Sequence, residues 1–427
     1  MQLHKYPSRP EWEALTRRPV METGSLEASV KNILQEVKEK GDEAVRRFTR
    51  QFDKADVQEL AASPEEFAAA QAALDPKLKA AILSARVNIE TFHKAQIVES
   101  QPVETMPGVL CWRKNVAIEK VGLYIPGGTA PLFSTVLMLG VPAKLAGCKE
   151  IILCTPPDAN GKIPDVILFA AKAVGITKVF RVGGVQAIAA MTYGTESIPK
   201  VSKIFGPGNQ YVNYAKQLVQ REGVAIDMPA GPSEVAILAD SSANAAFVAA
   251  DLLSQAEHGA DSQVILVSDS EELVRKVQAE LDKQAAALPR KDIIAQALHN
   301  SKMVITRNAA EAIELLNEYA PEHLILSCEN ASDFAEKIVN AGSVFLGHYS
   351  PESVGDYASG TNHTLPTNGY ARMYSGVSVD SFVKKITFQQ LSAAGLKNIS
   401  NTVIMMAEAE GLQAHAEAVK IRLRENN

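Results

Sequence analysis

From Val116 onward, short apolar runs alternate with helical runs, and this alternation limits the fold more than any other feature of the sequence. Continuous apolar strands separated by helices are typical of a parallel sheet whose two faces are both covered. Strands are therefore predicted at 121–125, 151–155, 179–182, 203–205, 235–238, 264–267, 303–305, 323–327 and 344–346.

The alternation restarts after a break at about 227–234, which divides it into two βα sets. We predict an α/β fold with two Rossmann-like βα domains and parallel sheets, plus a short N-terminal arm and a small helical C-terminal tail. The predicted boundaries are 1–20 for the arm, 21–123 plus 235–377 for the first domain, 124–234 for the second domain, and 378–427 for the tail.

Before the strands begin, the sequence predicts helices. Apolar residues at helical spacing predict one over 25–40. A second starts after Ser63, which can cap the helix, with Pro64 at the first helical position and Glu66 completing a capping box. A break is predicted at Asp75-Pro76, and helix continues to about Ala95.

Composition excludes several classes of protein. The 427-residue chain has a net charge of −6 with both signs mixed, so a basic nucleic-acid-binding surface is not expected. No apolar segment is long enough for a signal peptide or a membrane span. The four cysteines have no CxxC spacing and are predicted to be free thiols in a reducing cytoplasm. They are Cys111, Cys148, Cys154 and Cys328.

Four groups of polar residues could carry chemistry, and spacing alone leaves each one open. Gln255 and His258 share one face of a helix end, where the histidine could also simply complement the helix dipole. Glu322-His323, between a helix and a strand, could transfer protons or could be a solvated acid beside a core histidine. Asp356 and His363 lie in a long polar loop, where they could be ligands, although Asp and Asn are also ordinary turn formers. Glu410 and His415 lie in the helical tail, where a surface histidine is the ordinary alternative.

Three glycine-rich turns follow predicted strands, at 124–128, 183–186 and 205–209. Each could let backbone amides approach a phosphate. None is a complete GxGxxG motif, and the acid expected on the ribose would be Glu150, which precedes its strand instead of ending it. Nucleotide binding therefore stays open on spacing alone.

Read in order, these segments resemble the histidinol dehydrogenase family along nearly the whole chain, from about Ser25 to the C-terminus. The strings that carry the resemblance are YIPGG, GGVQAIAA, IFGPGN, DMPAGPSE, LLSQAEHG, APEHL, GDYASGTNHTLPT and EGLQAHAEAV. The resemblance implies oxidation of L-histidinol to L-histidine through an aldehyde, with two NAD⁺ and a bound zinc. It also implies that 124–234 binds NAD and that the other domain carries the metal and catalytic residues.

The same resemblance assigns roles by position. It implies zinc ligation by Gln255, His258, Asp356 and His415, and acid–base catalysis by Glu322 and His323. Contacts to NAD are implied at Tyr124, Gln186 and Asn209. Substrate contacts are implied at Ser233, Gln255, His258, His323, Asp356, His363, Glu410 and His415.

The implied assembly is a homodimer in which the tail docks on the partner subunit, so that each site takes His415 from the other chain. Two other classes were weighed. A zinc-dependent hydrolase could use the same ligands with Glu322 as base, but it leaves the glycine-rich turns unexplained. A non-enzymatic α/β scaffold would not need Glu322-His323 beside a metal loop.

Overall fold

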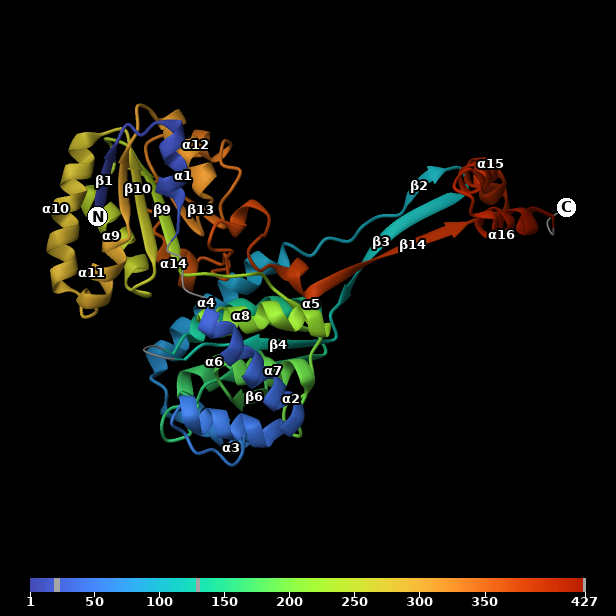
Figure 1. Ribbon diagram of the computed structural model, residues 1–427, viewed down its shortest axis with the longest axis horizontal. Coiled ribbons are helices and arrows are strands. Elements are labelled where there is room, and N and C mark those ends of the chain that lie inside the picture. Colours follow the sequence, from blue (N-terminus) through green and yellow to red (C-terminus); the bar gives the residue numbers. More distant parts are fainter. Residues whose placement is uncertain (19–23, 128–130, 425–427) are drawn as a thin grey trace.

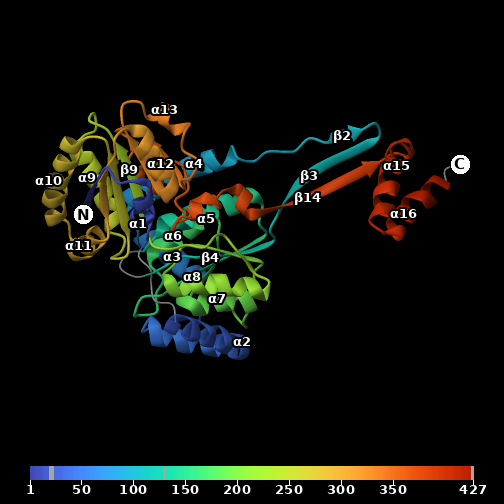
Figure 2. The same cartoon turned by 45° about the horizontal axis from the view of Figure 1, so that its top comes forward.

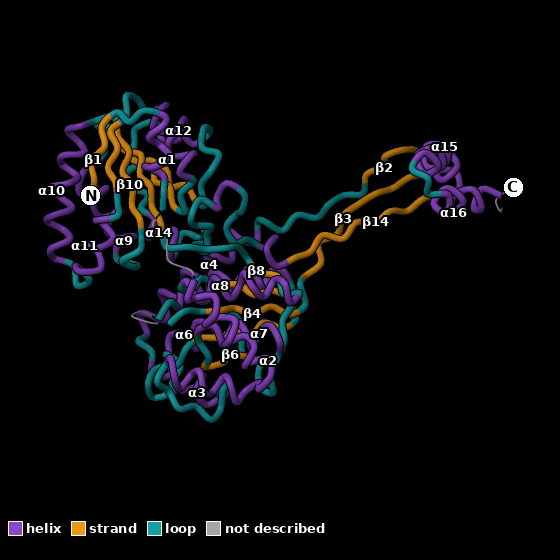
Figure 3. Tube along the Cα trace, viewed as in Figure 1, coloured by secondary structure: helices purple, strands orange, loops and turns teal. Residues whose placement is uncertain are grey.

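The computed structural model describes residues 1–18, 24–127 and 131–424, and has two α/β lobes with an extended stalk (Figure 1). The two parallel sheets lie in separate lobes, and the stalk carries the C-terminal helices well away from both (Figure 3). The predicted α/β class with two parallel sheets is confirmed.

The first lobe contains a six-stranded sheet in which every pairing is parallel. Along each strand, alternate side chains enter the two cores on opposite faces: Val235 and Ile237 on one, Ala236 and Leu238 on the other. In sheet order the strands are β1 (Gln2–Lys5), β11 (Lys302–Ile305), β10 (Gln263–Ser268), β9 (Glu234–Ala239), β12 (His323–Ser327) and β13 (Ser343–Leu346). The helices α9 (Ala245–Ala256), α10 (Glu271–Ala287) and α11 (Lys291–His299) cover one face, and α1 (Trp12–Thr16), α12 (Ala309–Tyr319) and α13 (Ala331–Ala335) the other.

The second lobe repeats this architecture with five parallel strands. Its order, β6-β5-β4-β7-β8, matches β11-β10-β9-β12-β13 of the first lobe. The strand order therefore reverses at equivalent places, between β4 and β7 here and between β9 and β12 in the first lobe. The strands are β4 (Lys120–Tyr124), β5 (Glu150–Thr155), β6 (Lys178–Arg181), β7 (Lys203–Phe205) and β8 (Ala225–Ile226). The helices α5 (Phe133–Ala146), α6 (Asp165–Ala173), α7 (Gly184–Tyr193) and α8 (Gln210–Val219) follow β4 to β7 in turn.

The predicted helices before residue 95 belong to the second lobe, so the assignment of 21–123 to the first domain was wrong. α2 (Gly24–Phe52) packs on α7 and α8, while α3 (Pro64–Ala73) and α4 (Pro76–Lys94) pack on α6 and α5. An apolar helix face shows that a helix is covered but not which sheet covers it. The capping box at Ser63 is confirmed: its side chain accepts from the backbone N–H of Glu66 at 3.3 Å.

The N-terminal residues are not a separate arm, because β1 pairs with β11 at the edge of the first sheet and Trp12 is buried in that lobe. The stalk is an antiparallel sheet of β2 (Val103–Met106), β3 (Val109–Ala117) and β14 (Val383–Leu391). It ends in two tail helices, α15 (Ala393–Ala409) and α16 (Gln413–Arg424), which both views place far from the two lobes (Figure 2). The predicted helical tail thus begins with a strand. Among the described helices, none combines the length and apolarity needed to cross a bilayer.

Candidate active site

Glu322 and His323 lie where β12 begins, at the amino edge of the first sheet. Both are fixed by the first residue of β9: the backbone N–H of Glu234 donates to Oε2 of Glu322 at 2.9 Å. The carbonyl oxygen of Glu234 lies 3.2 Å from Nδ1 of His323 and accepts its hydrogen. The side chains of Glu322 and His323 lie 3.7 Å apart, so they face each other although adjacent strand residues need not touch.

The environment shifts the pKa of both side chains. Burial raises the pKa of Glu322 to about 8, although the neighbouring His323 acts in the opposite direction. Burial alone would lower the pKa of His323, but the charges of Glu322 and Glu352 and a 3.2 Å hydrogen bond to Oδ1 of Asp356 raise it. A buried carboxyl and imidazole perturbed in this way are typical of an acid–base site.

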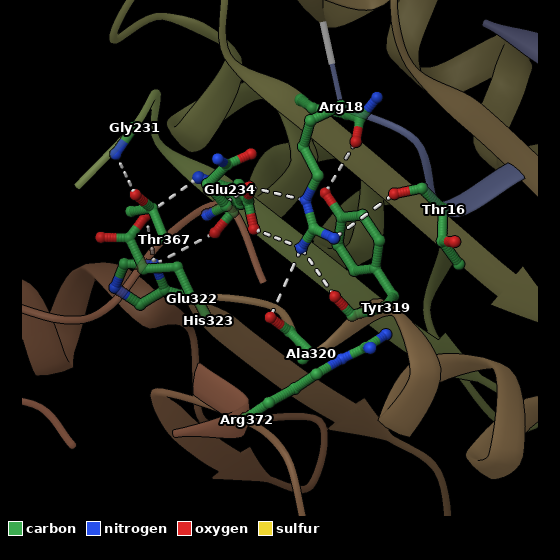
Figure 4. Close-up of polar contacts among 12 residues, drawn as sticks. Thr16, Arg18, Gly231, Glu234, Tyr319, Ala320, Glu322, His323, Thr367 and Arg372 are labelled. Atoms are coloured by element: carbon green, nitrogen blue, oxygen red, sulfur yellow. Dashed lines mark hydrogen bonds and ion pairs between the residues drawn. The ribbon is translucent and has the colours of Figure 1, made fainter. Parts of the chain in front are cut away.

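A buried ion pair between Arg18 and Glu234 fixes the residue that Glu322 and His323 contact (Figure 4). Nε and Nη2 of Arg18 each lie 2.9 Å from the Glu234 carboxylate, and the guanidinium stacks 3.8 Å from the ring centroid of Tyr319. The backbone N–H of Asn368 also donates to that carboxylate at 2.8 Å. The first residue of β9 is therefore held by its side chain while its backbone holds Glu322 and His323.

Gln255 and His258 approach the same place from the end of α9. Gln255 is buried, and its Nε2 lies 3.5 Å from Oε2 of Glu322. With its amide turned over, Gln255 donates to Oε1 of Glu352 at 2.8 Å and accepts from the backbone N–H of Glu234 at 3.1 Å, which satisfies both atoms better. His258 is open to solvent, yet the protein around it lowers its pKa while the charge of Asp356 acts against that shift.

Asp356 and His363 come from the long loop after β13. Asp356 lies on the short helix α14 (Glu352–Tyr357), and its backbone carbonyl accepts from Nδ1 of His363 at 2.8 Å. Nε2 of His363 lies 3.1 Å from Oγ1 of Thr135, on α5 of the second lobe. The loop therefore brings a carboxylate to His323 and also connects the site to the other lobe.

The structure thus gathers most of the predicted site residues at the amino ends of β9 and β12, with Ser233 immediately before β9. It also shows three that the sequence did not reveal: Arg18, Glu234 and Glu352. Glu234 carried a signal, since an acid opens the otherwise apolar run EVAILA. Arg18 and Glu352 carried no such signal in the sequence, because they become buried only through contacts with residues far away in the chain.

Glu410 and His415 are not brought to this cluster. Both are exposed, Glu410 at the end of α15 and His415 on α16, at the far end of the stalk (Figure 1). Among the described residues, no group of three or more His, Cys, Asp or Glu side chains is arranged to hold a metal ion. The four predicted zinc ligands are therefore not brought together within the described part of one chain.

A cavity of about 760 Å³ opens beside the carboxyl ends of the strands in the second lobe. The predicted dinucleotide contacts Tyr124, Gln186 and Asn209 all line it. Gln186 is only 1% exposed, and both polar atoms of its amide lack a hydrogen-bond partner among the described residues. Burying an amide without hydrogen-bond partners costs folding free energy, so this side chain is typical of a site that binds a polar ligand.

Glycine is required where this cavity meets the sheet. Gly206 has φ of +126°, and a Cβ there would lie 2.0 Å from the carbonyl oxygen of Tyr124. The turn after β7 can therefore approach β4 only without a side chain. This close approach lies at the point where the sheet order reverses, the usual position of a dinucleotide in such sheets.

Known proteins match this chain over its whole length. The family model for histidinol dehydrogenase matches residues 16–423. A histidinol dehydrogenase of Bacteroides fragilis is 60% identical and covers 100% of this chain and 99% of its own. One from Salmonella typhimurium is 51% identical over 96% of this chain and 94% of its own. The crystal structure of histidinol dehydrogenase from Elizabethkingia anophelis, 53% identical, superposes with a TM-score of 0.98 over 100% of this chain and 99% of its own. This chain belongs to the histidinol dehydrogenase family.

Proposed function

We propose that this protein oxidises L-histidinol to L-histidine by way of L-histidinaldehyde, with two NAD⁺ and a bound zinc ion. The observation that carries the proposal is that Glu322 and His323 lie side by side, both hydrogen-bonded to the backbone of Glu234. His363 connects this site to the second lobe through its contact with Thr135. Family membership supplies the substrate.

The residue types suit the two oxidations. In the first, His323 would take the proton of the alcohol hydroxyl, and NAD⁺ held by the second lobe would supply the hydride acceptor. The aldehyde then takes up water, a step that suits Glu322 as base, and the hydrate gives up a second hydride. Each oxidation reduces one NAD⁺ to NADH. A site that holds the aldehyde between the two steps also protects it from bulk solvent.

His258 and Asp356 would supply an imidazole nitrogen and a carboxylate oxygen, which are usual zinc ligands, and Gln255 would supply an amide oxygen, which is an unusual one. The ring of His258 makes no hydrogen bond to the described residues, so its nitrogens are available. If Asp356 ligates metal, Nε2 of His323 is released to act as a base. The bound metal would orient the imidazole and amine of histidinol.

The missing fourth ligand, His415, is proposed to come from the partner subunit. The stalk carries it away from its own site, and in a closed twofold dimer the exchange is reciprocal. Glu410, at the end of the preceding helix α15, is proposed to reach the substrate by the same route. Two tail helices that pack on neither lobe have little reason to be ordered unless a partner covers them.

NAD is proposed to occupy the cavity of the second lobe, with contacts to Tyr124, Gln186 and Asn209. The unpartnered amide of Gln186 supports this placement. A zinc hydrolase would leave that cavity without a role. All four cysteines are free, which supports a cytoplasmic location, and the charge of −6 gives no reason to expect nucleic acid as a partner.

The test is NADH absorbance with purified protein and L-histidinol. Two NADH should form for each histidinol consumed, and chelation should abolish turnover while circular dichroism shows the fold retained. Zinc should restore activity. Full activity in a metal-free sample would contradict the metal proposal, and absence of histidinol-dependent NADH in a zinc-loaded sample would contradict the reaction.

A further inference from the structure

Asp53 is a partly buried acid that the reaction does not use. It lies in the turn after α2 and lines the cavity of the second lobe. Its Oδ2 is buried without a hydrogen-bond partner among the described residues, and burial raises the pKa of this carboxyl to about 6. Tyr124 lines the same cavity.

The other acids near this sheet are already engaged. Asp158 also lines the cavity, but its Oδ1 accepts from the backbone N–H groups of Asn160 and Lys162, at 2.9 and 2.8 Å. Glu150, the acid expected from the sequence, opens β5 at the opposite edge and pairs with Lys178 at 2.5 Å. The acid after the second strand, the usual position of a ribose-binding acid, is therefore tied to its own turn through Oδ1, whereas Oδ2 of Asp53 has no hydrogen-bond partner among the described residues.

The charge of the cavity lining points to one form of the dinucleotide. Among the described lining residues there is no Lys, Arg or His. Sites that accept a 2′-phosphorylated ribose usually provide an arginine for that phosphate, whereas sites for the unphosphorylated ribose provide an acid for the hydroxyl. A phosphate beside Asp53 would be buried against a like charge with nothing to compensate it.

We propose that Asp53 accepts the hydroxyl hydrogens of the adenosine ribose and makes this cavity select the unphosphorylated dinucleotide over its 2′-phosphorylated form. The inference rests on the proposed binding of NAD in this cavity. It also gives α2 a role, because the turn after this helix brings to the cavity an acid whose Oδ2 has no other partner among the described residues. Tyr124 and Gln186 remain free to contact other parts of the same ligand.

The test measures direct binding of NADH and NADPH by isothermal titration calorimetry, with no turnover required. Wild type should bind NADH and discriminate strongly against NADPH. Asp53→Asn should weaken NADH by about 10- to 100-fold, as expected for a lost charge-assisted hydrogen bond, while NADPH binding should stay the same or strengthen. Asp53→Ala should behave in the same way. Asp56→Asn is the matched control, because that acid lies three residues away, 62% exposed and paired with Arg50; its affinities should equal those of wild type.

Stability separates this role from a structural one. Asp53→Asn removes a charge whose burial disfavours the folded state at neutral pH, so the variant should unfold at the same urea concentration as wild type or a higher one. Unchanged NADH affinity in both variants, or equal loss of NADH and NADPH affinity, would overturn the proposal for Asp53 alone. If wild type binds neither dinucleotide, the proposed NAD site fails as well.

Discussion

The ion pair between Arg18 and Glu234 allows a loss of stability to be worked from the structure. Glu234 is 1% exposed and Arg18 12%, so both charges are withdrawn from water. Arg18→Met removes two donors at 2.9 Å and leaves the Asn368 N–H, at 2.8 Å, as the remaining donor to the Glu234 carboxylate. Removing one partner of a buried pair costs about 3–5 kcal/mol. The upper part of this range is expected, because stacking on Tyr319 is lost too.

The assay is urea unfolding followed by the fluorescence of Trp12, which is buried in the same lobe, in a Trp112→Phe background. Lys5→Met is the control, because it breaks the Lys5–Glu271 pair, whose side chains are 48% exposed, and should not move the midpoint. Combining Arg18→Met with Glu234→Gln should recover much of the loss, since no unpaired charge remains. A loss below about 1 kcal/mol for Arg18→Met, or a double variant less stable than the single one, would refute the reasoning.

Two further predictions concern catalysis and cofactor binding. His323→Asn should slow oxidation of both histidinol and added histidinaldehyde, whereas Glu322→Gln should mainly slow the second half-reaction, so that an aldehyde trap collects the intermediate; equal loss in both halves for Glu322→Gln would contradict the division of roles. Gly206→Ala should weaken NADH binding in calorimetry at least tenfold or unfold the second lobe, because the added Cβ would lie 2.0 Å from the carbonyl oxygen of Tyr124; wild-type affinity in a stable variant would show that the turn can move.

The predictable parts of the fold are those that patterns of neighbouring residues determine. Apart from β1 and β8, which were not predicted, the strands of both parallel sheets are short, largely apolar runs, and the helix after Ser63 carries its own capping box. β1 and β14 could not be found in this way. Gln2–Lys5 is a short polar segment that is a strand because β11 accepts it as an edge partner. Val383–Leu391 is mostly exposed and is ordered by pairing with β3, more than 250 residues earlier in the chain.

The site shows the same division. Glu322, His323, Gln255 and Asp356 could be named from their strings, and the structure brings them together. Their supports Arg18 and Glu352 could not be named, because they are ordinary charged residues until the fold places them beside particular neighbours. The glycine-rich turns, which follow predicted strands, pointed to ligand binding at the carboxyl ends of strands. That holds for the cavity of the second lobe, whereas the acid–base pair lies at the amino end of β12.

The most direct test of the account is complementation between two inactive chains. Asp356→Ala and His415→Ala should each abolish activity as homodimers, because every site then lacks one proposed ligand. The two chains would be co-expressed with different affinity tags, and the mixed dimer purified through both tags. One of its sites carries both lesions and the other carries neither, so it should show about half the wild-type activity. A purified mixed dimer with no activity would contradict the shared site and place His415 with its own chain.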